Sequence, residues 1–143
     1  MDAAPAQGTL ERTNWREREQ ARNLCQVVAA APAEPLLVWC GNGHASKEKA
    51  GGGEREWIPM GWHFRAMSGI AQFVISQTVT VAFRGQDRSW VPALLAGLGD
   101  TLTDCGGAAG ILREQAPAPL NHHAGVDAVV VSADNELTQP WRR

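Results

Sequence analysis

A histidine that follows a glycine-rich turn is the residue best suited to chemistry in this sequence. His44 closes the tetrapeptide Gly-Asn-Gly-His at positions 41–44. The two glycines permit positive φ angles or a close backbone approach to a ligand. An imidazole titrates near neutral pH, so it can transfer a proton or bind a metal ion. We therefore predict His44 as a general base or metal ligand, and Asn42 and Gly43 as substrate contacts; the alternative is an ordinary loop histidine.

The carboxylate of Glu17 is the second candidate group. Glu17 lies in helical register with Ala21 and Val28, which places it at the end of an apolar stripe rather than on the solvated face of a helix. A carboxylate in that position needs a partner, and Arg16, His44 or a metal ion could supply it. We therefore predict Arg16 and Glu17 as site residues with His44, and Glu17 as a co-ligand of any metal. The alternative is a first-turn acid that favours the helix dipole.

The segment after His44 is expected to supply further substrate contacts. From position 41 to 58 the chain is polar and rich in glycine, with three consecutive glycines at 51–53. Such a loop often carries function, and we expect it to be mobile and to cover the site. The residues predicted to bind substrate around it are Trp57, Met60 and Trp62, together with Gln77, which follows a later strand.

The remaining cysteines and histidines predict no closed zinc site. The spacing of Cys40 and His44 relative to His63 or Cys105 matches no Cys/His framework. The three cysteines of the chain are an odd, widely spaced set, which indicates reduced thiols and a cytoplasmic location. His63 lies on a helix beside large apolar residues, where the usual role of a histidine is structural.

Helices and strands alternate around these residues. A helix is predicted from an N-cap at Asn14 to near Pro32, and a second from Pro59 to a stop at Gly69. Buried strands are predicted at 36–40 and 126–131, with one long or two short strands over 73–83. A third helix is predicted after Ser89, residues 105–112 fit a broken helix or a loop, and 116–125 is a Pro-rich connection.

This order predicts an α/β fold. We expect a mostly parallel sheet of three to five strands with helices on both faces, in a single domain over 14–140 that follows a flexible tail at 1–13. Because the ordered part opens with a helix and the sheet is narrow, it resembles half of a larger α/β domain. Ligands bind such sheets beyond the carboxyl ends of the strands, and 41–44 follows one of those ends.

The composition of the chain argues against two classes of partner, nucleic acid and the membrane interior. The 143-residue chain has a formal net charge of −2, without the basic surface that binds nucleic acid. It has no apolar run long enough to span a bilayer and no basic and apolar leader for export. We therefore expect a small-molecule or peptide ligand and no nucleic acid or membrane span.

Several motifs together resemble the C-terminal half of the erythromycin esterase, ChaN and Tiki superfamily. They are Arg16-Glu17-x-x-Gln20-Ala21-x-Asn23, Gly41-Asn42-Gly43-His44 after a strand, the Pro-Met-Gly at 59–61, and Val126-Asp127-Ala128-Val129-Val130, over about Asn14 to Pro140. The resemblance implies a catalytic or metal-ligating His44 supported by Arg16 and Glu17. Gln20 and Gly41 depart from the esterase motifs, which argues against macrolide ester cleavage.

Three functions are predicted, the first two from the resemblance and the third from the narrow sheet. The first is a hydrolase-like domain acting on an ester or peptide bond, with or without a divalent metal, and incomplete on its own because family members place further site residues in an N-terminal half. The second, suggested by ChaN, is a haem- or metal-binding module in which Met60, Trp57 and Trp62 form an apolar wall. The third is a subunit that completes its sheet by forming a homo-oligomer.

Overall fold

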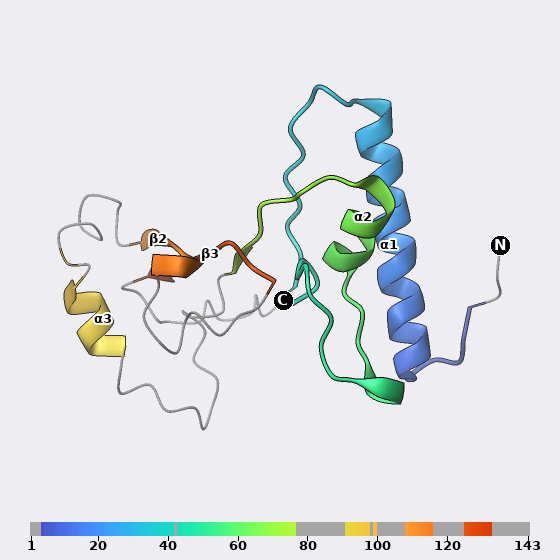
Figure 1. The fold of residues 1–143 in the computed structure, drawn as a ribbon, viewed down its shortest axis with the longest axis horizontal. Coiled ribbons are helices and arrows are strands. Elements are labelled where there is room, and N and C mark those ends of the chain that lie inside the picture. The colour runs from blue at the N-terminus through green and yellow to red at the C-terminus, as the bar shows by residue number, and fades with distance from the viewer. Residues whose placement is uncertain are drawn as a thin grey trace, which may run out of the picture. The chain divides into compact units, whose positions relative to one another are not determined.

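The computed structural model describes residues 4–41, 43–76, 91–97, 99, 108–115 and 125–132. The chain divides into two compact units, drawn in Figure 1. The first comprises Met1–Val74 with Ala124–Val126, and the second comprises Ile75–His123 with Asp127–Arg143. The prediction of a single domain over 14–140 stays a prediction.

The first unit is built on a long helix, α1, which spans Leu10–Ala30. Thr9 caps it, because its hydroxyl accepts a hydrogen bond from the Arg12 backbone N–H at 3.0 Å. The predicted start at Asn14 was therefore wrong, and residues 10–13 of the predicted tail are helical. The predicted end near Pro32 is confirmed, since Ala31 closes the helix.

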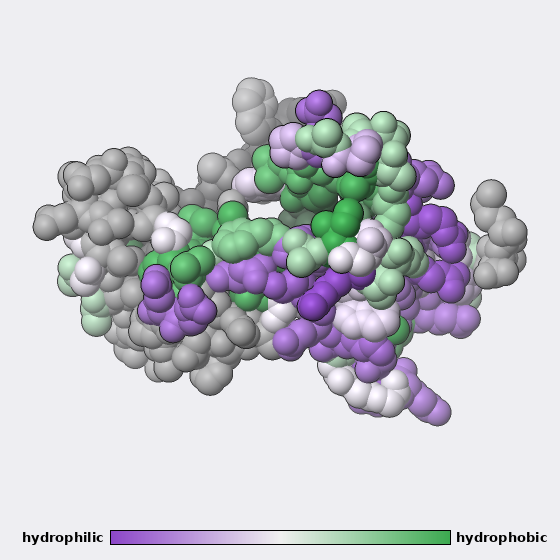
Figure 2. Space-filling view, turned by 45° about the horizontal axis from the view of Figure 1, so that its top comes forward, coloured by the Kyte–Doolittle hydropathy of each residue, from purple (hydrophilic) through white to green (hydrophobic). Residues whose placement is uncertain are grey.

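The second helix, α2, spans Met60–Ser68 as predicted. Pro59 stands at its N-cap, and Gly69 ends it in the left-handed conformation with φ 69°. α1 and α2 lie side by side (Figure 1), and Ala21, Met60 and Phe64 form the buried core of the unit. Hydrophilic residues cover the side of α1 that faces away from α2 (Figure 2).

The segment 36–40 differs from its prediction as a buried central strand. It belongs to no helix and to no described ladder, and Leu37 and Trp39 are 89% and 80% exposed. Only Cys40, at its end, packs against the core between α1 and α2. An apolar run favours an extended backbone, but pairing also needs a neighbouring strand, and no described residue supplies one.

The glycine-rich segment after 40 folds into a turn and a hairpin-like loop. Residues 43–45 form the turn, and Ala50 and Trp57 pair across the loop through two backbone hydrogen bonds of 3.0 and 2.7 Å. A short 3-10 helix, η1 (Gly53–Arg55), forms its tip. The mobility predicted for this loop stays a prediction.

Gly61 lets this segment lie directly against α2. A Cβ added at position 61 would come within 2.0 Å of the Ala45 carbonyl oxygen. The Gly61 N–H, one of the free donors at the start of the helix, instead donates to the His44 carbonyl oxygen at 2.9 Å. The position of the turn that carries His44 therefore depends on the missing side chain at 61.

The second unit contains a three-stranded sheet in the order β1-β3-β2. The strands are β1 (Ile75–Ser76), β2 (Ala108–Leu112) and β3 (Ala128–Ser132), accompanied by α3 (Val91–Gly97) and η3 (Arg113–Gln115). The α/β class is thus confirmed in its coarse form. The mostly parallel sheet is not, because β1 pairs with β3 in parallel but the longer β2–β3 pair is antiparallel.

Some predictions in this unit are confirmed, one is wrong, and others concern residues outside the described ranges. The strand predicted at 126–131 is β3, and the helix predicted after Ser89 includes α3. Residues 105–112, expected as a broken helix or loop, instead provide β2. The predicted strand over 78–83, the cap at Ser89 and most of the connection at 116–125 lie outside the described residues. Across the described ranges, no helix has both the length and the apolar character that crossing a membrane requires.

Candidate functional site

The structure brings Glu17 and His44 into direct contact. His44 Nδ1 lies 2.8 Å from both Oε1 and Oε2 of Glu17. The Glu17 side chain is fully buried, whereas that of His44 is 30% exposed. Glu17 projects from the second turn of α1, and His44 from the turn after residues 36–40. Of the three partners expected for Glu17, which were Arg16, His44 and a metal ion, Arg16 and His44 both contact it, although 36–40 does not deliver His44 from a sheet.

Two further donors hold the Glu17 carboxylate. The Met60 backbone N–H donates to Oε2 at 3.1 Å, and Arg16 Nη2 lies 3.4 Å from Oε1. The Met60 N–H is at the start of α2, where the helix dipole favours a negative charge. A buried carboxylate without such partners would be strongly destabilising. The sequence located the carboxylate but missed this backbone donor.

The arrangement sets the chemistry that the imidazole can do. With Glu17 ionised, the proton of a neutral His44 belongs on Nδ1, where it donates to the carboxylate. The lone pair on Nε2 is then available as a base or metal ligand. A Cβ at position 41 would stand 3.7 Å from Nε2 and 3.2 Å from Cδ2. Because position 41 is glycine, no side chain at this position crowds that edge of the ring.

The same contacts change the expected role of Glu17 at a metal. Its oxygens already accept from His44, Met60 and Arg16, and the side chain is fully buried. A carboxylate with these partners is better placed to orient a metal-binding histidine than to bind the metal ion itself. Among the described residues, no group of three or more His, Cys, Asp or Glu side chains is placed to hold a metal ion.

Trp57 forms one wall beside the imidazole. Its ring meets the His44 ring edge-on, with centroids 5.6 Å apart. A Cβ at Gly43, where φ is 85°, would come within 2.9 Å of the Trp57 ring. Gly43 and Trp57, both predicted substrate contacts, therefore lie at the site and fit closely against each other.

The other predicted substrate contacts are distributed differently. The Met60 side chain is buried in the core, so it cannot form the apolar wall expected for haem, and only its backbone reaches the site. Trp62 contacts the His63 ring and the Lys49 ammonium rather than the Glu17–His44 pair. Asn42 and Gln77 lie outside the described residues.

Neither Cys40 nor His63 has the properties of a second reactive group. Burial and, to a smaller extent, the negative charge of Glu17 raise the pKa of the Cys40 thiol, which keeps it protonated. Burial lowers the pKa of His63, and the charges of Arg18 and Lys49 lower it further against the opposing effect of Glu17. The structural role expected for His63 agrees with a neutral imidazole.

Asn14 is a site-supporting residue that sequence reasoning assigned to another role. Its Nδ2 donates to the Glu56 carbonyl oxygen, and its Oδ1 accepts from the Ile58 N–H, both at 2.9 Å. These bonds fasten α1 to the loop just before Pro59 and α2. The available signal was helical spacing, because Asn14 precedes Glu17 by three residues on the same face.

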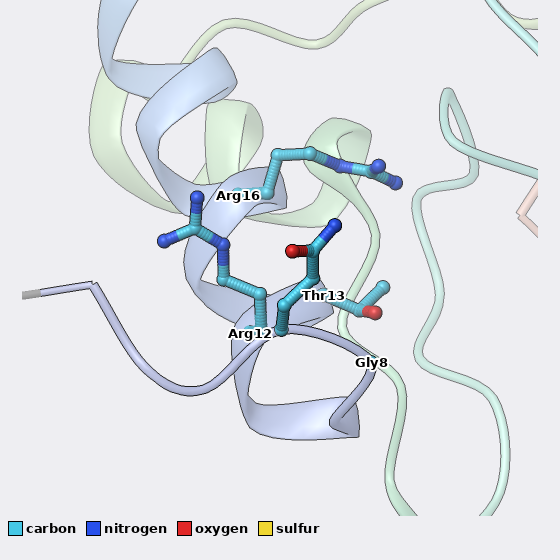
Figure 3. A pocket seen from close by; sticks show the side chains of 5 residues that line it. Gly8, Arg12, Thr13 and Arg16 are labelled. Carbon is cyan, nitrogen blue, oxygen red and sulfur yellow. The ribbon is translucent and has the colours of Figure 1, made fainter.

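A depression opens beside the site at the start of α1. Its lining residues are Gln7, Gly8, Arg12, Thr13 and Arg16. Arg12 and Arg16 project from successive turns of the helix, and Gly8 lies in the segment that leads into it (Figure 3). Arg16 thus belongs both to this depression and to the partners of Glu17.

No family model, curated protein or solved structure matches the chain. The resemblance to the erythromycin esterase, ChaN and Tiki superfamily therefore rests on the motifs alone.

Proposed function

We propose that this chain is a hydrolase-like domain in which His44 is the general base and Glu17 orients it. The observation that carries the proposal is the 2.8 Å separation of His44 Nδ1 from both oxygens of a fully buried carboxylate. A buried carboxylate on one ring nitrogen fixes the tautomer and leaves the other nitrogen as the base. The proposed substrate is an ester or peptide, as the motif resemblance implies.

The proposed step is proton removal from water. Nε2 of His44 takes a proton as the water oxygen bonds to the carbonyl carbon, and the imidazolium formed is stabilised by the charge of Glu17. The imidazolium then returns the proton to the leaving oxygen or nitrogen as its bond to the former carbonyl carbon breaks, which releases an alcohol or an amine. A positioned base of this kind contributes about 10²–10⁴-fold to the rate. Arg16 supports the step by holding Glu17 from the other side.

A divalent metal is compatible with the same residues. His44 would bind it through Nε2, Glu17 would orient the ring, and a bound metal would supply a more acidic water. The further ligands would come from outside the described residues. We retain the larger α/β domain implied by the resemblance as part of this proposal, since such a domain would supply them.

Comparison of histidine variants tests the proposal. A panel of p-nitrophenyl esters and short peptides is incubated with the wild-type chain, His44→Ala, Glu17→Gln and the control His63→Gln. We expect His44→Ala to lose about 10²–10⁴-fold in kcat/KM and His63→Gln to match the wild type. Equal hydrolysis by His44→Ala and wild type would contradict the proposal, and so would no hydrolysis by the wild type, with or without added Zn²⁺ or Mn²⁺.

The exposed segment at 36–40 favours a second candidate, an oligomerising subunit. Leu37 and Trp39 present two large, exposed apolar side chains on a segment that pairs with no described strand and could pair with a strand of another copy. We expect a dimer or larger species in light scattering that Trp39→Lys converts to a monomer. A monomeric wild-type chain at high concentration would contradict it.

A further inference from the structure

We propose that the depression at the start of α1 binds an anionic group, a carboxylate or a phosphate, carried by the ligand of the Glu17–His44 site. This deepens the proposed function, on which its link to a substrate rests. Two of the five lining residues are arginines, and none is acidic. Guanidinium groups pair with the oxygens of carboxylates and phosphates through two parallel hydrogen bonds.

Among the described residues, none pairs with the N–H groups of the Arg12 guanidinium. Its guanidinium carbon lies 4.4 Å from the centroid of the Trp15 ring. Stacking of this kind holds the flat face of a guanidinium while its N–H groups stay available around the rim. Within the described ranges, the Arg12 guanidinium forms no hydrogen bond and no ion pair. By contrast, Arg22, on the same helix, donates to Glu19 Oε1 at 2.7 Å.

Arg16 connects the depression to His44. Its side chain is 54% exposed, and its 3.4 Å contact with Glu17 uses one Nη atom, so other donors remain. Oε1 of Glu17 is contacted by Arg16 Nη2 and by His44 Nδ1. Arg16 and His44 therefore share one carboxylate oxygen as a partner, which links the depression to the residue that orients the proposed base.

The two arginine side chains, rather than the backbone N–H groups at the start of α1, would bind the anion. The Arg12 backbone N–H is already satisfied by the Thr9 hydroxyl, and the Thr13 hydroxyl donates to the Thr9 carbonyl oxygen. Arg12 and Arg16 are four residues apart on α1, a spacing at which like charges repel, and their guanidinium groups point in different directions (Figure 3). A bound anion would remove that repulsion, which Glu17 offsets only at Arg16.

Titration with small aromatic anions tests the proposal. Benzoate, phenyl phosphate and the neutral control benzamide are titrated into the full chain and followed by NMR. We expect saturable binding of at least one anion, weakened by salt, and no binding of benzamide. Arg12→Gln with Arg16→Gln should weaken it by about tenfold or more. Arg65→Gln, an exposed arginine of α2, should bind as the wild type does.

The two anions distinguish a carboxylate from a phosphate ligand, and the outcomes separate this proposal from the proposed function. Equal binding by the wild type and the double variant, equal binding of benzamide, or binding of neither anion would overturn the anion site. Anion binding by the wild type and by His44→Ala, with no ester hydrolysed by the wild type, would support the anion site and reject the hydrolase. Hydrolysis with the same kcat/KM for neutral and anionic esters would support the hydrolase and reject the anion site as part of it.

Discussion

His44 Nδ1 contacts both oxygens of the Glu17 carboxylate across 27 positions of sequence. The contact joins the second turn of α1 to the turn after residues 36–40, and the Met60 N–H joins the start of α2 to the same carboxylate. One buried charge therefore fixes three pieces of the first unit relative to one another. This arrangement makes stability and proposed activity depend on the same residue.

Removing the Glu17 carboxylate should destabilise the first unit. Glu17→Ala leaves the Met60 N–H buried without an acceptor and deprives His44 of its partner, so we expect a loss of about 1–3 kcal/mol in the free energy of unfolding. Urea unfolding measures it. Glu19→Ala is the matched control, because Glu19 forms an exposed pair with Arg22 that should contribute less than about 1 kcal/mol. Equal losses in the two variants would contradict the role given to Glu17.

Adding one methyl group at position 61 should displace the His44 turn. The new Cβ of Gly61→Ala would meet the Ala45 carbonyl oxygen, and relieving that overlap should cost about 1–3 kcal/mol or more. Thermal unfolding and ester hydrolysis should both fall. Gly97→Ala in α3 adds the same methyl group with no atom within 4 Å, so it should be neutral or slightly stabilising. A fully stable, active Gly61→Ala would show that the close approach is not required.

Stability should fall on mild acidification partly through His63. The folded chain lowers the His63 pKa below the ordinary value of 6.5, so above that pH both states are neutral and His63 has no effect. As the pH falls below 6.5, the unfolded chain takes up a proton that the folded chain does not, and stability is lost until the folded pKa is reached. His63→Gln should therefore lose less stability than the wild type between pH 7 and about pH 5 in urea unfolding. An unchanged pH slope would contradict this.

The Cys40 thiol should react slowly. Burial and the nearby Glu17 charge raise its pKa, so less thiolate is present than at an ordinary cysteine. Alkylation by iodoacetamide at about pH 8, followed by mass spectrometry of the Cys40 peptide, should be slower than alkylation of a free cysteine peptide. Glu17→Gln should partly restore the rate. Reaction at the rate of the free peptide would contradict the partly buried position of Cys40 against the core.

Much of the first unit could be predicted because its signals are local. The stripe through Glu17 and Ala21 identified the buried face of α1, while Pro59 and Gly69 marked the ends of α2. A buried carboxylate that needed a partner pointed to Arg16, His44 or a metal ion, and the structure shows contacts with both Arg16 and His44. The predicted start of α1 was wrong because Thr9 and Asn14 are both good N-cap residues. In the structure Thr9 is the cap, whereas the Asn14 side chain forms hydrogen bonds with residues 56 and 58.

The errors elsewhere concern pairing between distant segments. An apolar run such as 36–40 specifies an extended backbone but not a neighbouring strand, so burial on both faces could not be inferred from it. The reverse holds for β2, whose small residues Ala108 to Gly110 have weak strand propensity but pair with β3. The hydrogen bond from the Met60 backbone N–H to Glu17 was not predicted, because side-chain patterns carry no information about backbone donors.

The tautomer of His44 tests the central claim most directly. Nitrogen-15 NMR of the imidazole at about pH 9, where an ordinary histidine is neutral, distinguishes a protonated from an unprotonated ring nitrogen. We predict a protonated Nδ1 and an unprotonated Nε2 in the wild type, and loss of that preference in Glu17→Ala. A wild-type ring that carries its proton on Nε2 would contradict the account, because Glu17 would then not hold Nδ1 and the proposed base would not be free.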